Sequence, residues 1–138
     1  MAVFPSDEWL RTYKDAINAS ETYARLASEW EGDVAYVIEP EPDLGVMEES
    51  WGWVDLWHGT CRDARLVTPE EGGRSRYVIR APYSQWKEVL LGRLDPIKAM
   101  TTGKLKLRGD LPEISRQREA VSELARIASG IPTTFPDA

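Results

Sequence analysis

The sequence predicts an α+β fold in which helices cover one face of a single sheet. Apolar residues with helical spacing gather toward the two ends of the 138-residue chain, whereas segments of alternating apolar residues fill its middle. Five strands and about five helices can be distinguished in this order, with no internal repeat. Segregated strands and helices are typical of an α+β fold, because a doubly wound α/β fold alternates them. We expect one domain over residues 1–138.

Two helices are predicted within residues 1–29. Ser6 is expected to cap the first, because Asp7 and Glu8 follow it in the first turn, where negative charge is favourable. Ser20 is expected to cap the second. Their aromatic side chains are expected to pack in the core. The two apolar stripes are Trp9, Leu10, Tyr13, Ala16 and Ile17, then Tyr23, Leu26, Ala27 and Trp30.

The middle of the chain is expected to supply four strands. In the first, Val34, Tyr36 and Ile38 share one face, because successive side chains of a strand point to opposite sides. The connector that follows contains two prolines, which a central strand excludes, so we expect a loop at 39–45. The segment TPEEGG at 68–73 is expected to form a turn. The four strands are predicted at 34–38, 51–58, 60–67 and 74–81.

Three tryptophans leave the orientation of the second strand open. Trp51, Trp53 and Trp57 fall on one face together with Asp55. If this face is solvated, it forms an apolar patch of the kind that binds a partner or a membrane surface. If it faces the helices, the indoles line the interior. We expect Trp53 to pack inward, because an exposed row of indoles is costly for a soluble monomer.

Two shorter helices, a fifth strand and a long helix are predicted after the fourth strand. Ser84 and Asp95 are expected to cap the two shorter helices, and Gly103 to end the second one. In the fifth strand, at 104–108, leucines alternate with basic residues, which predicts one aliphatic and one charged face. The longest helix is predicted at 110–129 and a loose tail at 131–138.

The segment WKEVLLGRLDPIKAMTTGKLKLRGD at 86–110 resembles the signature region of the sterol carrier protein (non-specific lipid transfer) domain family. The resemblance implies a five-stranded, mostly antiparallel mixed sheet backed by helices, with an apolar tunnel between the layers. It also implies that the tunnel holds an acyl chain or a sterol. The residues that carry the resemblance are Gly92, Asp95, Pro96, Met100, Gly103, Leu105, Leu107, Gly109 and Asp110.

The sequence offers little for catalysis or metal binding. His58 is the only histidine and Cys61 the only cysteine, so the pair supplies two ligands where a zinc site needs three or four. No oxyanion arrangement can be recognised near them, and neither a phosphate loop nor a dinucleotide fingerprint occurs. We therefore expect a protein that is not an enzyme and that uses no metal or cofactor.

Charge and hydropathy narrow the choice of partners and compartment. The net charge is −6, with thirteen acidic and three basic side chains in residues 1–58 but ten and fourteen in residues 59–138. An acidic protein is a poor binder of nucleic acid, although the basic half could attract anionic head groups. No apolar run is long enough to insert across a bilayer, and we expect neither a signal peptide nor an internal disulfide. We expect a cytoplasmic location.

These observations favour a binding protein that holds a fatty acid, acyl-CoA, sterol or similar hydrophobic ligand. An alternative is an accessory subunit of the same fold that docks on an enzyme partner or dimerises through the tryptophan-rich surface. Periodicity alone would assign the candidate wall residues to the core, whereas the resemblance implies that they surround a cavity. The candidates are Trp53, Tyr77, Ile79, Trp86, Leu90, Ile97, Met100, Leu105, Leu107, Val121, Leu124 and Ile127.

Overall fold

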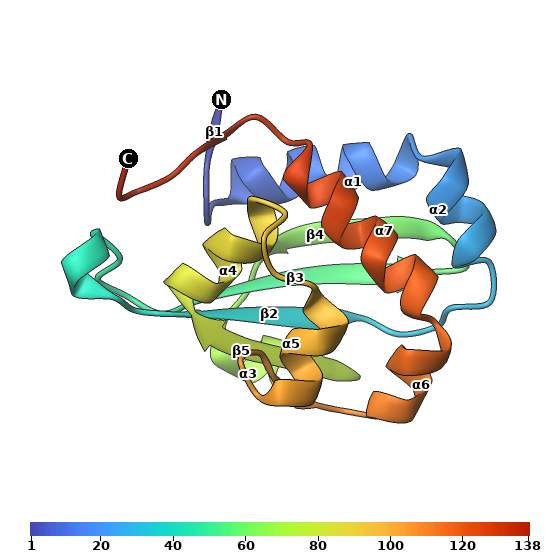
Figure 1. Ribbon diagram of the computed structural model, residues 1–138. Helices are drawn as coiled ribbons and strands as arrows, with labels where there is room; N and C mark the ends of the chain where they lie inside the picture. Colours follow the sequence, from blue (N-terminus) through green and yellow to red (C-terminus); the bar gives the residue numbers. More distant parts are fainter.

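The fold is built on a five-stranded sheet that carries helices on one face (Figure 1). The computed structural model describes all 138 residues. The strands are β2 (Val34–Glu39), β3 (Ser50–Trp57), β4 (Thr60–Leu66), β5 (Tyr77–Pro82) and β6 (Lys106–Arg108). They lie in the order β4-β3-β2-β5-β6, and only the β2–β5 pair is parallel. The predicted mixed, mostly antiparallel sheet of an α+β fold is confirmed.

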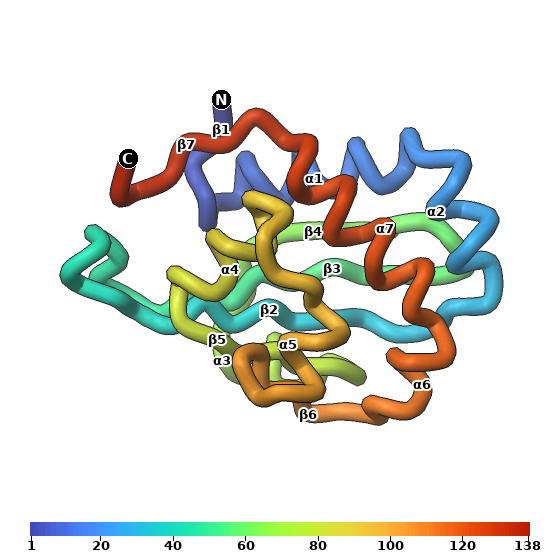
Figure 2. The backbone as a smooth tube through the Cα atoms, in the orientation of Figure 1, coloured from blue at the N-terminus to red at the C-terminus, as the bar shows by residue number.

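Six helices form a layer over one face of this sheet, and the backbone tube shows the same two layers (Figure 2). None of the helices combines the length and the apolar character that crossing a bilayer requires. A seventh, α3 (Pro69–Gly72), packs against the other face, where a turn was expected. The six are α1 (Asp7–Asn18), α2 (Glu21–Leu26), α4 (Tyr83–Leu90), α5 (Pro96–Thr102), α6 (Leu111–Arg116) and α7 (Arg118–Ser129).

Side-chain caps begin most of these helices where the sequence predicts them. The Ser6 and Ser20 hydroxyls accept from backbone N–H groups in the first turns of α1 and α2, and Asp95 does the same for α5. Ser84 is the exception, because the N-cap of α4 is Pro82, two residues earlier, which provides no side-chain hydrogen bond. The Ser84 backbone N–H donates instead to Glu41, which ties α4 to the β2–β3 connector.

The alternation predicted for the central strands is confirmed, and it fixes the tryptophan face. Val34 and Val54 belong to the main core under the helices, whereas Trp51 belongs to a small cluster on the opposite face. Because side chains alternate along β3, Trp53 and Trp57 share this outer face. The expectation that Trp53 packs inward is therefore wrong. Its indole N–H donates to the Asp33 carboxylate at 2.8 Å, so the outward-facing indole has a polar partner.

The long helix predicted at 110–129 is two helices that meet at Gln117, where the backbone leaves helical geometry (φ −100, ψ 26). Ile114 and Ala120 are both buried and lie six residues apart. A continuous helix of 3.6 residues per turn would point them to different sides. The break lets both residues face the core, and no glycine or proline marks it in the sequence.

The C-terminal segment is held more firmly than the loose tail that the sequence predicts. Strand β7 (Thr133–Thr134) pairs in parallel with β1 (Ala2–Val3). Beyond it, Asp137 accepts hydrogen bonds from the Tyr83 hydroxyl at 2.7 Å and from the Lys87 ammonium at 2.9 Å. The two ends of the chain therefore lie together beside α4 (Figure 2).

Candidate ligand-binding cavity

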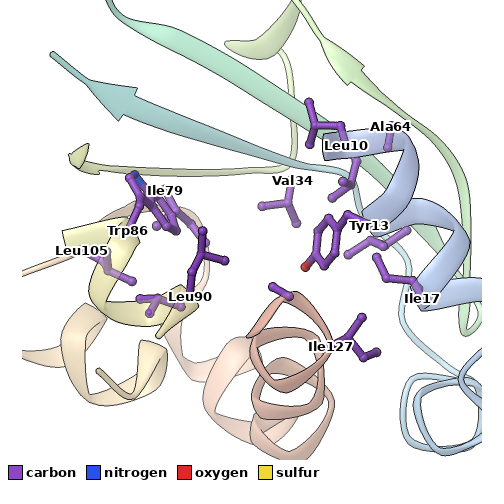
Figure 3. Packing of buried hydrophobic residues seen from close by; sticks show 14 of the residues in the cluster. Leu10, Tyr13, Ile17, Val34, Ala64, Ile79, Trp86, Leu90, Leu105 and Ile127 are labelled. Atoms are coloured by element: carbon purple, nitrogen blue, oxygen red, sulfur yellow. The ribbon is translucent and has the colours of Figure 1, made fainter. Parts of the chain in front are cut away.

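An apolar cavity of about 110 Å³ lies between the inner face of the sheet and the helices. Of the 26 residues that line it, 23 are hydrophobic, and none carries a charged side chain. The walls come from both layers, so the cavity exists only when sheet and helices are packed together. Figure 3 shows part of this packing, in which Trp86 and Leu90 of α4 approach Ile79 of β5.

Tyr36 shows that the interior is incompletely filled. It lies on the helix-facing side of β2, the central strand, between Gly52 on β3 and Ile79 on β5. Its inward neighbours Val34 and Ile38 are almost completely buried, yet Tyr36 is only half-buried. A residue at the centre of a covered sheet face keeps accessible surface only where the covering layer leaves space. The accessible surface of Tyr36 therefore belongs to the cavity wall.

On the helical side, α5 and α7, which lie side by side in Figure 1, both contribute to the wall. Pro96 begins α5 and is half-buried, as are Val121, Leu124 and Ala125 on α7. All four residues line the cavity. The boundary between α5 and α7 is therefore part of the cavity wall.

The structure brings eight of the twelve predicted wall residues to the cavity. Ile97 and Ile127 are buried in the same core but lie behind the wall, and Leu107 is only half-buried on β6. Trp53 is on the outer face of the sheet. The eight residues at the wall are Tyr77, Ile79, Trp86, Leu90, Met100, Leu105, Val121 and Leu124.

Several wall residues near the N-terminus were assigned to the core from the sequence. Their apolar periodicity was visible, but periodicity cannot distinguish a packed core from the wall of a cavity. These residues are Trp9, Leu10, Tyr13, Tyr23 and Trp30. Phe4 and Tyr36 also line the cavity, although neither was predicted as core or wall.

The polar atoms of the wall are indole N–H groups and tyrosine hydroxyls. The N–H groups of Trp9, Trp30 and Trp86 each donate to a protein oxygen at 2.9 Å, so all three are satisfied. The hydroxyls of Tyr13 and Tyr36 lie 3.5 Å apart. Burial raises the pKa of the Tyr36 phenol to about 12 and that of Tyr13 well above its ordinary value, so both remain neutral.

The residues considered for catalysis lie outside the cavity and have other partners. His58 Nε2 lies 2.6 Å from the Glu31 carboxylate, and the Cys61 thiol donates to the Asp63 carbonyl at 3.2 Å. Burial raises the pKa of Cys61 to about 11, which keeps the thiol protonated and unreactive. No group of three or more His, Cys, Asp or Glu side chains is placed to hold a metal ion.

On the outer face of the sheet, arginines cover the three tryptophans. The guanidinium carbons lie within about 6 Å of the indole centroids, the range in which cations and aromatic rings attract each other. The pairs are Arg62 over Trp57 at 4.7 Å, Arg65 over Trp53 at 5.1 Å and Arg80 over Trp51 at 5.5 Å. This face is therefore a mixed aromatic and cationic surface, on which Trp57 retains 39% exposure.

An apolar cavity enclosed between a mixed sheet and a layer of helices defines the class of protein, a lipid-carrier fold. The chain belongs to the SCP-2 sterol transfer family, whose model matches residues 11–118. This confirms the resemblance found in the signature region. A search among curated proteins finds no match.

Solved structures agree with the family assignment. The chain is 36% identical to a crystal structure of sterol carrier protein 2, covering 91% of this chain and 97% of that one with a TM-score of 0.83. It is also 36% identical to a possible sterol carrier protein from Thermus thermophilus, with coverages of 92% and 88% and a TM-score of 0.81. The fold also occurs within an enzyme: a sec-alkyl sulfatase variant matches 70% of this chain, over 14% of its own length, at 17% identity and a TM-score of 0.50.

Proposed function

We propose that this protein is a carrier that holds a fatty acid, an acyl-CoA, a sterol or a similar hydrophobic molecule between its sheet and its helices. The observation that supports this most directly is the accessible surface of Tyr36 inside a covered sheet, because a packed core leaves no such space. Affinity would come mainly from buried CH₂ groups, at about 0.8 kcal/mol each.

The bound molecule is proposed to leave the protein unchanged. No histidine, cysteine, lysine or carboxylate lines the cavity, so no side chain of ordinary basicity or nucleophilicity reaches a ligand inside it. The charged head of an ionised fatty acid or an acyl-CoA would stay outside the wall. Basic side chains at the surface are the expected contacts for such a head.

A long ligand requires the cavity to enlarge. Sites for drug-sized ligands usually measure about 300–1,000 Å³, whereas the volume here is about 110 Å³. The α5 helix is the element that we expect to move, because glycines with positive φ, Gly92 and Gly103, precede and follow it. No other part of the protein lies within 4 Å of the position that a Cβ would take at either glycine. Movement of α5 away from α7 would enlarge the cavity on this side.

The alternative, an accessory subunit that docks through its tryptophans, has one observation in its favour. All three tryptophans of β3 do lie on the outer face of the sheet. Each is already covered by an arginine, however, which reduces the apolar area that a partner could bury. We therefore place the carrier function first.

Native mass spectrometry of freshly purified protein is the first test. The expected result is a 15.6 kDa chain with additional mass that denaturation releases as a lipid. Titration with Nile red, a neutral fluorescent probe, should then show saturable binding to protein from which the lipid has been removed. A lipid-free dimer that binds no Nile red would contradict the carrier function and favour the docking alternative.

Two leucines provide a matched pair of variants for the same assay. Leu105 is 1% exposed and lines the cavity, whereas Leu107, two residues later, does not line it. Leu105→Trp should abolish Nile red binding by filling the cavity, at a stability cost of about 1–3 kcal/mol from overpacking. Leu107→Trp should bind as the wild type does. Circular dichroism checks that both variants are folded. If the two folded variants bind Nile red equally, Leu105 does not belong to the binding site.

A further inference from the structure

Three tyrosines from three different elements meet at the cavity. Tyr13 comes from α1, Tyr23 from α2 and Tyr36 from the central strand β2, and all three line the cavity. Figure 3 shows Tyr13 with its hydroxyl directed between the strand that carries Val34 and the helix that carries Ile127. These side chains bring phenolic oxygens into an otherwise apolar wall.

Most of the hydrogen-bonding capacity of these hydroxyls is not used within the protein. The Tyr13 and Tyr36 oxygens are 3.5 Å apart, beyond the usual O–H···O range of about 2.5–3.0 Å. The Tyr23 hydroxyl makes no hydrogen bond to any protein group, although the residue is 1% exposed. A phenol offers one donor and can also accept. The cluster can therefore receive a further polar atom without breaking existing bonds.

The electrostatic surroundings select a neutral polar atom. No charged side chain lines the cavity, so a carboxylate brought to the cluster would be buried without a counter-charge, which is strongly unfavourable. Burial raises the pKa of all three phenols, so they stay protonated and able to donate at physiological pH. A neutral group such as an alcohol, a ketone or a protonated acid can instead pair with these hydroxyls without bringing a charge into the cavity.

We propose that the hydroxyls of Tyr13, Tyr23 and Tyr36 form a polar subsite that binds an uncharged, hydrogen-bonding end of the hydrophobic ligand. The subsite rests on the proposed carrier function and specifies its ligand class. The bound molecule enters with a neutral oxygen leading and its hydrocarbon part along the apolar walls. A molecule with an ionised head binds with that head outside and makes no use of the subsite.

Tyr77 provides an internal control for this subsite. It also lines the cavity and is also buried, but its ring lies beside the Arg76 guanidinium, 5.6 Å from the guanidinium carbon. Its ring also packs against Trp30, with centroids 5.2 Å apart, and beside Gly109 in the turn before α6, and it makes no hydrogen bond to the three tyrosines of the cluster. Removing the Tyr77 hydroxyl therefore changes the wall without changing the subsite.

The experiment compares 1-decanol with n-undecane, which replaces the hydroxyl by a methyl group, as displacers of Nile red. Tyr13→Phe, Tyr23→Phe and Tyr36→Phe each remove one hydroxyl and little volume, and Tyr77→Phe is the matched control. We expect Tyr36→Phe to weaken decanol binding about three- to tenfold, the effect of one lost hydrogen bond, and to leave undecane binding within about twofold. Tyr77→Phe should leave the ratio of the two dissociation constants unchanged.

The outcomes separate the subsite from the carrier function. If the substitutions in the cluster change the binding of decanol and of undecane equally, the proposed subsite does not exist, whereas the carrier function is unaffected. The same conclusion follows if Tyr77→Phe alters the ratio as much as Tyr36→Phe does. If neither ligand binds to the wild-type protein, in displacement or in native mass spectrometry, both proposals are overturned.

Discussion

At the scale of single residues, Tyr36 connects the sheet to the candidate site. Its backbone pairs with both β3 and β5, so its position is fixed by the central strand of the sheet. Its ring packs edge-on against Trp86, with centroids 5.5 Å apart, and its hydroxyl approaches Tyr13. A side chain held in this way can present a polar atom to a ligand with little further loss of conformational entropy.

Cys61 should be almost inert toward thiol reagents in the folded protein. Burial raises its pKa from the ordinary value of 9.0 to about 11, so the reactive thiolate is about 100-fold scarcer at pH 8 than for a free thiol. We expect labelling by 5,5′-dithiobis(2-nitrobenzoic acid) to be slower than in guanidinium chloride by at least this factor. Equal rates in the two solutions would show that the thiol is accessible and that the turn from β3 to β4 opens readily.

Eight of the twelve residues that the sequence predicted for the wall line the cavity, but the same reasoning assigned one tryptophan to the wrong face. Alternation along β3 placed Trp51, Trp53 and Trp57 together, which is correct, but it could not tell which face the helices cover. The deciding contacts come from distant parts of the chain: Asp33 accepts from Trp53, and Arg65 stacks over it. Such long-range partners make an outward indole acceptable, and no local pattern reveals them.

At the scale of elements, caps and alternation predicted boundaries well, whereas breaks caused by packing were missed. Asp95 caps α5 as expected, and Asp110 caps α6 at the predicted start of the long helix, because a cap depends only on neighbouring residues. The break at Gln117 depends instead on which residues must face the core. The pairing of β7 with β1 joins residues from opposite ends of the chain, so it too lies beyond local sequence reasoning.

Asp137 should stabilise the C-terminal segment in a pH-dependent way. Its hydrogen bond from Lys87, followed by the one from Tyr83, lowers the pKa of this carboxyl. A lowered pKa in the folded state gives stability that is present above the unfolded value of about 3.9 and is lost as the pH falls through the folded value. We expect Asp137→Asn to reduce the free energy of unfolding by about 1 kcal/mol at pH 7.

The comparison is made by urea denaturation, with Asp43→Asn as the control, since Asp43 is exposed in the β2–β3 connector. The difference between wild type and Asp137→Asn should narrow as the solution is acidified, because the wild-type carboxyl then also becomes neutral. A difference that stays constant with pH would mean that the carboxylate charge is not the cause.

At the scale of the whole molecule, the cavity and the fold depend on the same packing between sheet and helices. The signature region supplies part of both: Leu105 lies in the wall, and α5 carries Pro96 and Met100 there. The N-terminal helices supply the opposite part, including Tyr13 and Tyr23. A ligand that fills the cavity therefore contacts both the signature region and the N-terminal helices. Because it adds contacts that are missing around the empty cavity, binding should stabilise the entire domain.

Thermal unfolding with and without ligand measures this linkage. A ligand that binds only the folded state, at 100 times its dissociation constant, adds about 2.7 kcal/mol of stability, which raises Tm by about 10 °C for a domain of this size. We expect this shift for 1-decanol with the wild-type protein and with Leu107→Trp, and no shift with Leu105→Trp, whose cavity is filled. If 1-decanol raises Tm equally in all three proteins, it binds elsewhere, and the exposed Trp57 on the outer face becomes the surface to investigate.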